Sequence, residues 1–468
     1  MYSLCQRACR RRGVHRCDRE AHRAQADVLD EASLRFLGLS LHRERIFYGW
    51  WVVAAGFGLE ALIGSLFFYA YGAYVVLLRE EFGWSRTLLS AAFALARAES
   101  AVLGPIQGWL TDRFGPRVLI RTGMIVLGVG FMLFSRISGP VSFFLVFFVM
   151  AVGAGLGGYL PITVAIVNWF RRRRAQALSL SSVGMAMGGL MTPLVAGLML
   201  QVGWRWTAFL SGVVIIVAGL PLAQLMRHRP EAYGWRVDGD AADAPAAATA
   251  ARGPAEAEFT ARQALRTRAF WLISAGHGAA LLVVSAVMVH MVVHVTERLG
   301  ISLAQAAGVV SLITLTQIAG QLGGGWAGDR FSKRAIVVGC MVGHATALLL
   351  LAYATAYWMV VVFAMLHGLA WGTRGPLMAA IRADYFGSGS FGMISGISSM
   401  VVMIGMIAGP LVAGILADRT GSYVTGFTVL ALMAALGSVF FLLARRPTPP
   451  AAQRREAVPS AAATAPTS

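Results

Sequence analysis

Charged side chains are scarce in this chain of 468 residues. Asp, Glu, Lys and Arg make up 13% of it, whereas hydrophobic residues make up 57%. Soluble domains average about 25% charged residues and about 45–50% apolar residues. The mean hydropathy of +0.66 agrees with this imbalance. A water-soluble globule is therefore excluded, and we expect most of the chain to lie in lipid.

Acidic residues and lysine are especially rare. The 40 basic residues outnumber the 22 acidic ones, the formal net charge is +18, and Lys333 is the only lysine. A basic excess indicates nucleic-acid binding when it covers one face of a soluble domain. Here long apolar runs separate the arginines, so we expect no nucleic-acid partner.

Cysteine is limited to Cys5, Cys9 and Cys17 in a polar tail and Cys340 in an apolar run. This distribution implies no disulfide framework. The spacing of the three tail cysteines and His15 matches no standard zinc pattern. We therefore expect no bound metal.

Sequence motifs of enzymes are also missing. The chain has no glycine-rich phosphate loop ending in Gly-Lys-Ser/Thr, no HExxH zinc helix and no nucleophile elbow. We expect a protein that is not an enzyme and uses no cofactor. Any energy for its work would come from an ion or solute gradient rather than from ATP.

Long apolar runs are what the chain has in abundance. A helix needs about 20 apolar residues to cross about 30 Å of hydrocarbon, and these runs lack the alternation of β-barrel strands. The first begins near Phe47, too deep and too long for a cleavable signal peptide. We predict an all-α membrane protein of twelve transmembrane helices. The runs lie at 47–78, 88–110, 118–135, 141–169, 178–202, 207–226, 270–295, 305–327, 335–355, 357–382, 393–417 and 424–444.

The basic residues predict how the chain is threaded, because cytoplasmic loops are rich in Lys and Arg. If the N-terminus is inside, most basic residues fall in the inner loops and tails. Both termini are therefore predicted to be cytoplasmic, in a multi-pass protein of the plasma (inner) membrane. The outer exceptions are Arg79, Arg86, Arg136, Arg205, Arg298 and Arg419.

Composition changes divide the chain into five parts. An Ala- and Pro-rich stretch between the sixth and seventh runs has the composition of a flexible linker, and Thr260 is a plausible N-cap for a short interfacial helix within it. The predicted parts are a disordered basic tail (1–45), an N-terminal six-helix bundle (46–226), a cytoplasmic linker (227–268), a C-terminal six-helix bundle (269–446) and a disordered tail (447–468).

The two bundles share an internal repeat. When the sequence is slid along itself so that Gly108 falls on Gly325, GWLTDRFGPR (108–117) lies on GWAGDRFSKR (325–334). In the same register, called the repeat register below, PLVAG (193–197) lies on PLVAG (410–414). A duplicated six-helix unit explains both matches. Such repeats in transporters meet near the bilayer midplane at a shared binding site.

The duplicated GxxxDRxGxR loops, after the second and eighth runs, resemble the signature of the major facilitator superfamily of secondary transporters over roughly 46–446. The segments YGWWVV, EEFGWSR, NWFRRRRAQALSL and RPEAYG resemble its monocarboxylate and oxalate/formate porter branch. The resemblance implies two pseudo-symmetric halves working by alternating access. It also implies that spans 1, 4, 7 and 10 line the central cavity.

The two loop motifs are candidates for a gate. We predict that Asp112 and Asp329 cap neighbouring helix ends, and that the motif arginines hold the cytoplasmic ends of the spans together. The alternative is that these residues only set the topology by charge. The gating candidates are Gly108, Asp112, Arg113, Arg117, Gly325, Asp329, Arg330 and Arg334.

Arg374 is the main candidate for substrate binding. A charged side chain inside a membrane span is costly and is a functional candidate by default. A guanidinium on a cavity helix suits a carboxylate, which it can bind bidentately. His367 and Trp371 share its helical face. The alternative is that Arg374 forms a salt bridge between helices or snorkels to the interface.

Other ionisable groups within the runs are candidates for coupling. Glu60 and Arg97 lie at similar depths on adjacent spans, so they are predicted to form a buried pair or to take part in proton coupling. Glu99 is expected to pair with another span. His290 is a further proton-handling candidate, with hydrogen-bonded packing as the alternative.

The chain departs from the monocarboxylate branch at key positions. The substrate-binding arginine that the branch carries in span 8 corresponds to Gln321, and the acidic residue one turn earlier corresponds to Gln317. The lysine that some members carry in span 1 falls at about Tyr69. These three residues are candidates for substrate binding, but Arg374 would have to supply the charge.

The sequence thus predicts a secondary transporter that moves a small organic anion, a mono- or dicarboxylate, by symport or antiport in a proton or solute gradient. The competing hypotheses are an exporter of drugs or neutral metabolites and a non-transporting membrane sensor with the same fold. The expected partners are a small-molecule substrate, protons and the lipid bilayer, and the protein is expected to be monomeric.

Overall fold

The computed structural model describes residues 47–240 and 258–448. Within these ranges the regular structure is helical, and no strand occurs. The two predicted tails and the middle of the predicted linker lie outside the described residues.

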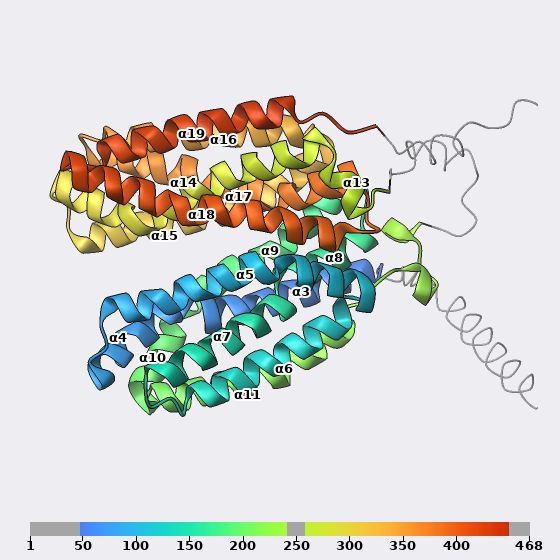
Figure 1. The fold of residues 1–468 in the computed structure, drawn as a ribbon, viewed down its shortest axis with the longest axis horizontal. Coiled ribbons are helices and arrows are strands. Elements are labelled where there is room, and N and C mark those ends of the chain that lie inside the picture. The colour runs from blue at the N-terminus through green and yellow to red at the C-terminus, as the bar shows by residue number, and fades with distance from the viewer. Residues whose placement is uncertain (1–46, 241–257, 449–468) are drawn as a thin grey trace, which may run out of the picture. The chain divides into compact units, whose positions relative to one another are not determined.

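The helices form two groups, blue to green and yellow to red in Figure 1. The first half contains α3 (Gly49–Ile63), the π-helix η1 (Gly64–Tyr69), α4 (Tyr71–Phe82), α5 (Arg86–Phe114), α6 (Pro116–Phe134), α7 (Pro140–Gly157), α8 (Tyr159–Trp169), α9 (Arg174–Leu190), α10 (Thr192–Val202) and α11 (Trp204–Leu225). The second half contains α14 (Arg268–Leu299), α15 (Leu303–Arg330), α16 (Lys333–Ala352), α17 (Tyr357–Phe386), α18 (Phe391–Thr420) and α19 (Tyr423–Leu443).

Every predicted apolar run coincides with a helix or a broken helix of the described chain. Ten of these helices are long and apolar enough to cross a membrane. The helices α5 and α17 are the two that fall outside this set, and they carry Glu99, Arg374 and Arg382. Charge in these two helices therefore lowers the hydropathy signal.

Three spans of the first half are interrupted, whereas their repeats in the second half are continuous. Span 1 passes through η1, span 4 breaks at Gly158 and span 5 breaks at Met191. Gly158 has φ −103° and ψ −140°, far from helical values. The equivalent helices α14, α17 and α18 run unbroken. The repeat thus preserves the order of the helices but not their straightness.

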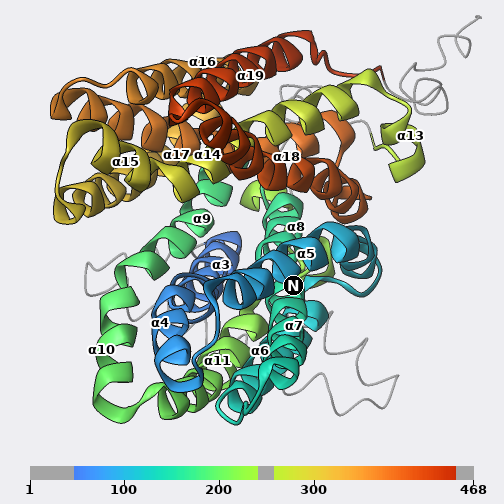
Figure 2. The same ribbon diagram turned by 60° about the vertical axis from the view of Figure 1, so that its left-hand side comes forward.

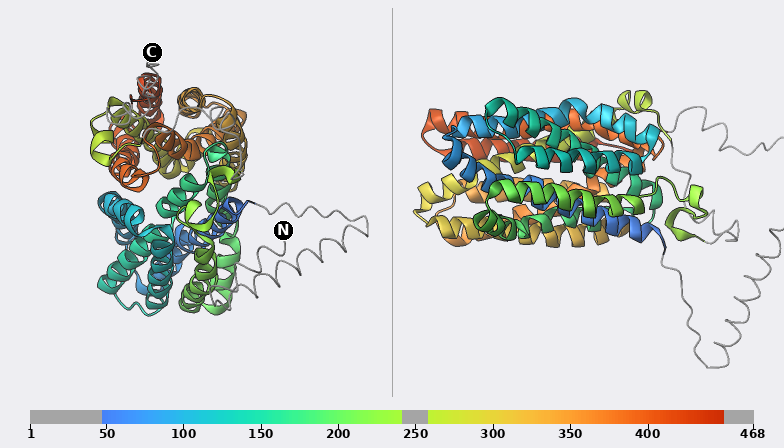
Figure 3. Two further views of the ribbon diagram at one scale, coloured as in Figure 1. Left: turned by 90° about the vertical axis from the view of Figure 1, so that its right-hand side faces the viewer. Right: turned by 90° about the horizontal axis from the view of Figure 1, so that it is seen from below.

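The two halves meet mainly through α5 against α18 and α9 against α15, which are equivalent pairs in the repeat register. Figure 2 shows α5 and α18 beside each other, and Figure 3 shows that the helices of both halves run alongside one another. A methyl group at Gly108 would overlap the carbonyl oxygen of Gly392, and one at Gly396 would overlap that of Gly104. Glycine at these positions lets the two backbones touch.

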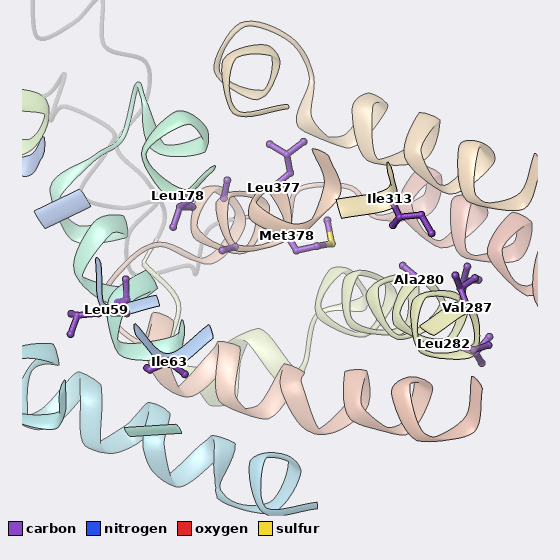
Figure 4. Packing of buried hydrophobic residues seen from close by; sticks show 14 of the residues in the cluster. Leu59, Ile63, Leu178, Ala280, Leu282, Val287, Ile313, Leu377 and Met378 are labelled. Atoms are coloured by element: carbon purple, nitrogen blue, oxygen red, sulfur yellow. The ribbon is translucent and has the colours of Figure 1, made fainter. Parts of the chain in front are cut away.

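Buried apolar side chains fill each half and continue across their boundary. Figure 4 shows Leu59 and Ile63 of α3, Leu178 of α9, and Leu377 and Met378 of α17. All five are less than 5% exposed. This packing forms the scaffold on which the polar residues of the interior are held.

Both described ends of the linker are packed on the bundle, so the chain is held there. The carboxylate of Asp238 accepts hydrogen bonds from the backbone N–H groups of Arg171 and Arg172. The short helix predicted after Thr260 is α13 (Ala261–Leu265), capped by the Thr260 hydroxyl.

Glu258 repeats this contact in the second half, where it accepts from the N–H groups of Ser388 and Gly389. In the repeat register Arg171 and Arg172 fall on these two positions. The linker is therefore anchored to equivalent loops in the two halves.

Candidate functional site

The motif end of the bundle is defined here as the end at which the loops after α5 and α15 lie. There Asp112 of α5 reaches the other half: its Oδ1 accepts from Gly392 N at 2.9 Å and its Oδ2 from Met393 N at 2.8 Å. These two N–H groups belong to the first turn of α18, where backbone donors are unsatisfied and the helix dipole is positive. Asp112 thus caps a helix of the opposite half.

Asp329 makes the equivalent contact in the reverse direction. Its Oδ1 accepts from Ala175 N at 2.8 Å and its Oδ2 from Gln176 N at 3.0 Å, in the first turn of α9. The repeat register relates both carboxylates and both helix starts. The two carboxylates therefore form a duplicated connection that closes the motif end.

The first arginine of each motif does not join spans, which corrects the prediction for Arg113 and Arg330. Each is exposed and lies over a tryptophan of its own helix. The guanidinium carbon of Arg113 is 5.3 Å from the ring centre of Trp109, and that of Arg330 is 4.4 Å from Trp326. Their described contacts are local.

The second arginine of each motif joins helices within its own half. Arg117 Nε donates to the carbonyl of Met226 at 2.7 Å, and Arg334 donates to that of Ala444 at 3.4 Å. Both acceptors follow the last helix of their half. These two arginines therefore hold each half together as a unit.

A third connection at the motif end was missed by the sequence analysis. Arg174 is 2% exposed and donates to Asp384 at 2.7 Å across the two halves. Lys333 lies 2.9 Å from the other oxygen of Asp384. The repeat has no equivalent of this ion pair, because Phe391 and Val167 occupy the matching positions.

The chain that leaves α11 also packs against the motif end. His228 lies against Gly115, which begins the turn between α5 and α6. Burial, together with the positive charge of Arg229, lowers the pKa of His228. The imidazole is therefore neutral in this arrangement at physiological pH.

The interior of the second half holds two arginines that pair with no carboxylate among the described residues. Arg374 is 0% exposed, and none of its three guanidinium nitrogens has a hydrogen-bond partner among the described residues. Arg382 is 5% exposed and donates to Nδ1 of His277 at 2.8 Å. Because His277 accepts this bond at Nδ1, its neutral ring carries the proton on Nε2.

Arg382 was assigned no role in the sequence analysis, where it is the last residue of the run 357–382. The helix α17 continues to Phe386, so Arg382 lies inside it, two turns beyond Arg374. His277 had no role assigned to it either. Together the three residues form a basic cluster (Arg374, Arg382 and His277).

Residues of the first half face this cluster. Tyr159 is the first residue of α8, directly after the break at Gly158, and lies within electrostatic reach of Arg374, Arg382 and Glu60. Tyr159 is 45% exposed, and Glu60 is 2% exposed. The break in span 4 therefore turns a tyrosine toward the basic cluster.

A cavity of about 320 Å³ adjoins Tyr159. Its walls are mainly apolar and aromatic, and two residues of α18 complete them from the second half. The lining residues are Ile63, Phe67, Phe68, Ala96, Ser100, Gly104, Gln107, Phe147, Ala151, Ala154, Gly155, Gly158, Tyr159, Leu160, Met185, Ser399 and Met403.

The structure places His367 differently from the prediction. The Nδ1 atom of His367 lies 3.2 Å from Nδ1 of His344, on α16, and both rings are 0% exposed. His367 thus faces a neighbouring helix of its own half. Trp371 is partly buried, with its ring centre 6.3 Å from that of His367. Neither side chain lines the cavity.

Gln317, Gln321 and Tyr69 occupy the positions of charged residues in the monocarboxylate branch. Their described contacts do not include the basic cluster. Gln321 Nε2 lies 3.5 Å from the carbonyl oxygen of Ser182, in the contact between halves. Gln317 is buried where α15 meets Gly372 of α17. The ring of Tyr69 lies against α9.

Two coupling candidates are hydrogen-bonded to other groups of the described chain. Glu99 is buried and accepts from Ser100 and from Gln107, both at 3.0 Å, so its described partners lie on its own helix and not on another span. His290 Nε2 donates to the carbonyl of Pro410 at 3.0 Å. The side chain of Arg97 lies outside the described residues, so its pairing with Glu60 stays a prediction.

The arrangement of two repeated halves can now be compared with known proteins. The profile of the Major Facilitator Superfamily matches residues 53–293 and 273–466. The chain belongs to this superfamily. It is therefore an integral, multi-pass membrane protein.

Individual relatives agree with this assignment. Monocarboxylate transporter 13 of Bos taurus is 25% identical over 400 residues, which cover 84% of this chain and 88% of that protein. The predicted resemblance to the monocarboxylate branch is thereby confirmed. Membrane sensor protein UhpC of Salmonella typhimurium is 27% identical over 264 residues, which cover 54% of this chain and 57% of the sensor.

A solved structure shares the fold. The crystal structure of the human organic anion transporter MFSD10 aligns with a TM-score of 0.66 and 16% identity. The alignment covers 84% of this chain and 99% of that one. At this level of identity the likeness concerns the fold alone.

Proposed function

We propose that the protein is a secondary transporter of small organic anions, mono- or dicarboxylates, that bind at Arg374. The observation that carries this proposal is the unpartnered, fully buried guanidinium of Arg374. A buried charge without a partner is strongly unfavourable, and a bound anion would compensate it. A carboxylate can accept two parallel N–H bonds from one guanidinium.

The surroundings of Arg374 support an anionic substrate. Arg382 adds a second positive charge, and the Nε2–H group of His277 and the hydroxyl of Tyr159 are neutral donors. The adjoining cavity of about 320 Å³ is mainly apolar, which suits the hydrocarbon part of a carboxylate. None of the three residues of the basic cluster lines this cavity, so Tyr159 is the residue that connects the charged and the apolar parts of the proposed site.

The contacts at the motif end support alternating access. Asp112, Asp329 and Arg174 join the halves there, so the structure corresponds to the state that is closed at this end. In the predicted topology the motif end is cytoplasmic. Breaking these contacts while the halves rock would open the basic cluster to the cytoplasm.

The test is flux through purified protein in proteoliposomes. A panel running from formate and oxalate to aromatic monocarboxylates would be offered with and without a pH gradient. We expect saturable exchange of at least one carboxylate, and its loss in Arg374→Gln with expression unchanged. Carboxylate exchange that survives Arg374→Gln would remove Arg374 from the site. Exchange of neutral drugs but of no anion would favour the exporter hypothesis.

Similarity to a membrane sensor protein supports one alternative, a sensor that binds its ligand without moving it. Such a sensor would show carboxylate binding to the purified protein but no flux. Thermal stabilisation by carboxylates, measured beside the exchange assay, separates the two. The duplicated carboxylate contacts at the motif end favour transport, because a sensor has no need of two matching closures.

A further inference from the structure

Two imidazole rings form a sealed pair inside the second half. His344 of α16 and His367 of α17 are 0% exposed, and their ring centres are 4.8 Å apart. The Nδ1 atoms are 3.2 Å apart, and neither Nε2 has a hydrogen-bond partner among the described residues. Buried side-chain nitrogens usually have partners, so these two unpartnered atoms require an explanation.

The geometry of the pair fixes how many protons it can hold. In an Nδ1···Nδ1 hydrogen bond one ring donates and the other accepts, so the donor ring has a free lone pair on Nε2. A proton added to this lone pair gives an imidazolium–imidazole pair that keeps the bond. A second added proton would place two N–H groups against each other. The pair can therefore gain one proton.

The charged surroundings of the pair are dominated by Arg374. Its guanidinium is within electrostatic reach of both rings. The other titratable groups nearby are Cys340 on α16, His277 on α14 and Tyr159 across the boundary between the halves, each within reach of Arg374.

Of the other helices in the described part of this half, α14 has charged residues only at its two ends, Arg268 at its start and Glu297 and Arg298 in its last turn. In the described chain, α19 contains no Asp, Glu, Lys or Arg, and α15 contains none before Asp329 at the motif end. The acidic and basic residues of α18, Asp418 and Arg419, lie in its last turn at the opposite end. Burial of the two rings opposes an extra proton on the pair, and among the charged groups outside the pair Arg374 repels it most.

We propose that the pair of His344 and His367 is the proton-binding site that couples anion transport to a proton gradient. This inference rests on the proposed function, because the anion at Arg374 removes the repulsion. When a carboxylate binds, one proton from the water on that side is taken up by the free Nε2. When the carboxylate leaves on the other side, the proton returns to water there. Binding of the proton must favour the anion by the same factor.

The first experiment measures protons directly. Purified protein in weakly buffered detergent solution, with a pH indicator dye, receives a carboxylate identified by the exchange panel. We expect uptake of about one proton per anion bound, because the pair has one free position. Anion binding with no proton uptake by the unaltered protein would overturn the proposal whatever the variants do.

The second experiment uses His344→Asn, His367→Asn and the double variant, whose amides can hydrogen-bond but bind no proton at physiological pH. Proteoliposomes are assayed for exchange at equal pH and for accumulation driven by a pH gradient. We expect the variants to keep exchange within about threefold and to lose accumulation and proton uptake. His294→Gln is the matched control, because the hydrogen bond described for His294 is to the carbonyl of Leu351 and glutamine can replace that donor.

The outcomes separate the two proposals. Accumulation by the pair variants equal to that of the unaltered protein would overturn the proton site and leave carboxylate transport intact. Absence of carboxylate binding and exchange in the unaltered protein would instead overturn the proposed function and this inference with it. A variant that fails to fold does not decide the question, because the dye measurement on the unaltered protein still does.

Discussion

The most consequential residue is Arg374, whose guanidinium has no hydrogen-bond partner among the residues that the structure describes. If Arg374 binds an anion in the working protein, the substitution Arg374→Met should stabilise the ligand-free protein. The reason is that it replaces a buried charge by an apolar side chain. We expect a higher midpoint of thermal unfolding by several degrees, and no further gain on adding carboxylate. The exposed Arg136→Met is the control and should change neither value.

A lower unfolding midpoint for Arg374→Met in the absence of ligand would contradict this view. It would show that the guanidinium already has a stabilising partner in the empty protein. Differential scanning fluorimetry in detergent, with and without carboxylate, gives both numbers from the same sample.

Tyr159 is expected to contribute one hydrogen bond to the bound anion. Tyr159→Phe removes the hydroxyl and leaves the ring in the cavity wall. The loss of one hydrogen bond, about 0.5–1.5 kcal/mol, corresponds to a rise of about 2- to 13-fold in the KM for carboxylate exchange. The maximal rate should change little. An unchanged KM in the exchange assay would place the hydroxyl outside the site.

For single residues, the sequence predicts which charged side chains are energetically costly in lipid. It does not predict which side chains contact each other. Arg374 stands out because arginine in an apolar run is expensive. Arg382 lies on the same helix and is also buried, yet near the end of a run it reads as a loop cation. His344 and His367 belong to different helices, so only the packing of α16 on α17 reveals their pairing.

The first turns of α9 and α18 make the contacts that close the motif end, with Asp329 and Asp112 respectively. The double variant Asp112→Asn/Asp329→Asn removes both charges while keeping the side-chain volumes. Hydrogen bonds to charged groups contribute about 1.5–3 kcal/mol each, so the closed state should lose at least about tenfold in population. We expect slower transport with unchanged expression.

Distances between spin labels at the exposed Phe114 and Phe331 would report the closure, with the native cysteines replaced. The double variant should shift these distances to longer values. Asp418→Asn, at the exposed opposite end of α18, should leave them unchanged. Unaltered distances and flux in the double variant would reduce the two carboxylates to a role in topology.

The helices themselves are readily predicted, because apolar runs of this length have few alternatives in lipid. The breaks are not. Gly157 and Gly158 permit the interruption of span 4, but glycine is tolerated in membrane helices without one. The cavity and Tyr159 depend on that break, which explains why the sequence indicated Arg374 but not the cavity or Tyr159.

For the whole molecule, the orientation in the membrane is the prediction to check first. The motif end, with both termini, is predicted to be cytoplasmic. In intact cells, a membrane-impermeant thiol reagent should label Ser138→Cys, in an exposed loop at the opposite end. It should reach Ser332→Cys, at the exposed motif end, only after permeabilisation. The reverse pattern would invert the topology and every statement about the direction of transport.

The architecture of the whole followed from the repeat. A single repeat register predicts two halves, and the same register relates the contacts of Asp112 to those of Asp329. It fails where the halves have diverged. Three features have no counterpart in the other half: the ion pair of Arg174 with Asp384, the basic cluster and the histidine pair. Comparing the sequence with itself therefore does not reveal them. The residues for which we propose a function lie where the symmetry is lost.

The anchored linker has a mechanical consequence. About 20 residues separate Asp238 from Glu258 along the chain, and a fully extended chain of that length spans at most about 66–72 Å. A linker of this length would not limit the movement of one half relative to the other. Each described end is held at a loop of its own half, by Asp238 in the first half and by Glu258 in the second. Changing the length of the linker should therefore affect transport less than removing the hydrogen bonds of Asp238 or Glu258 at its ends.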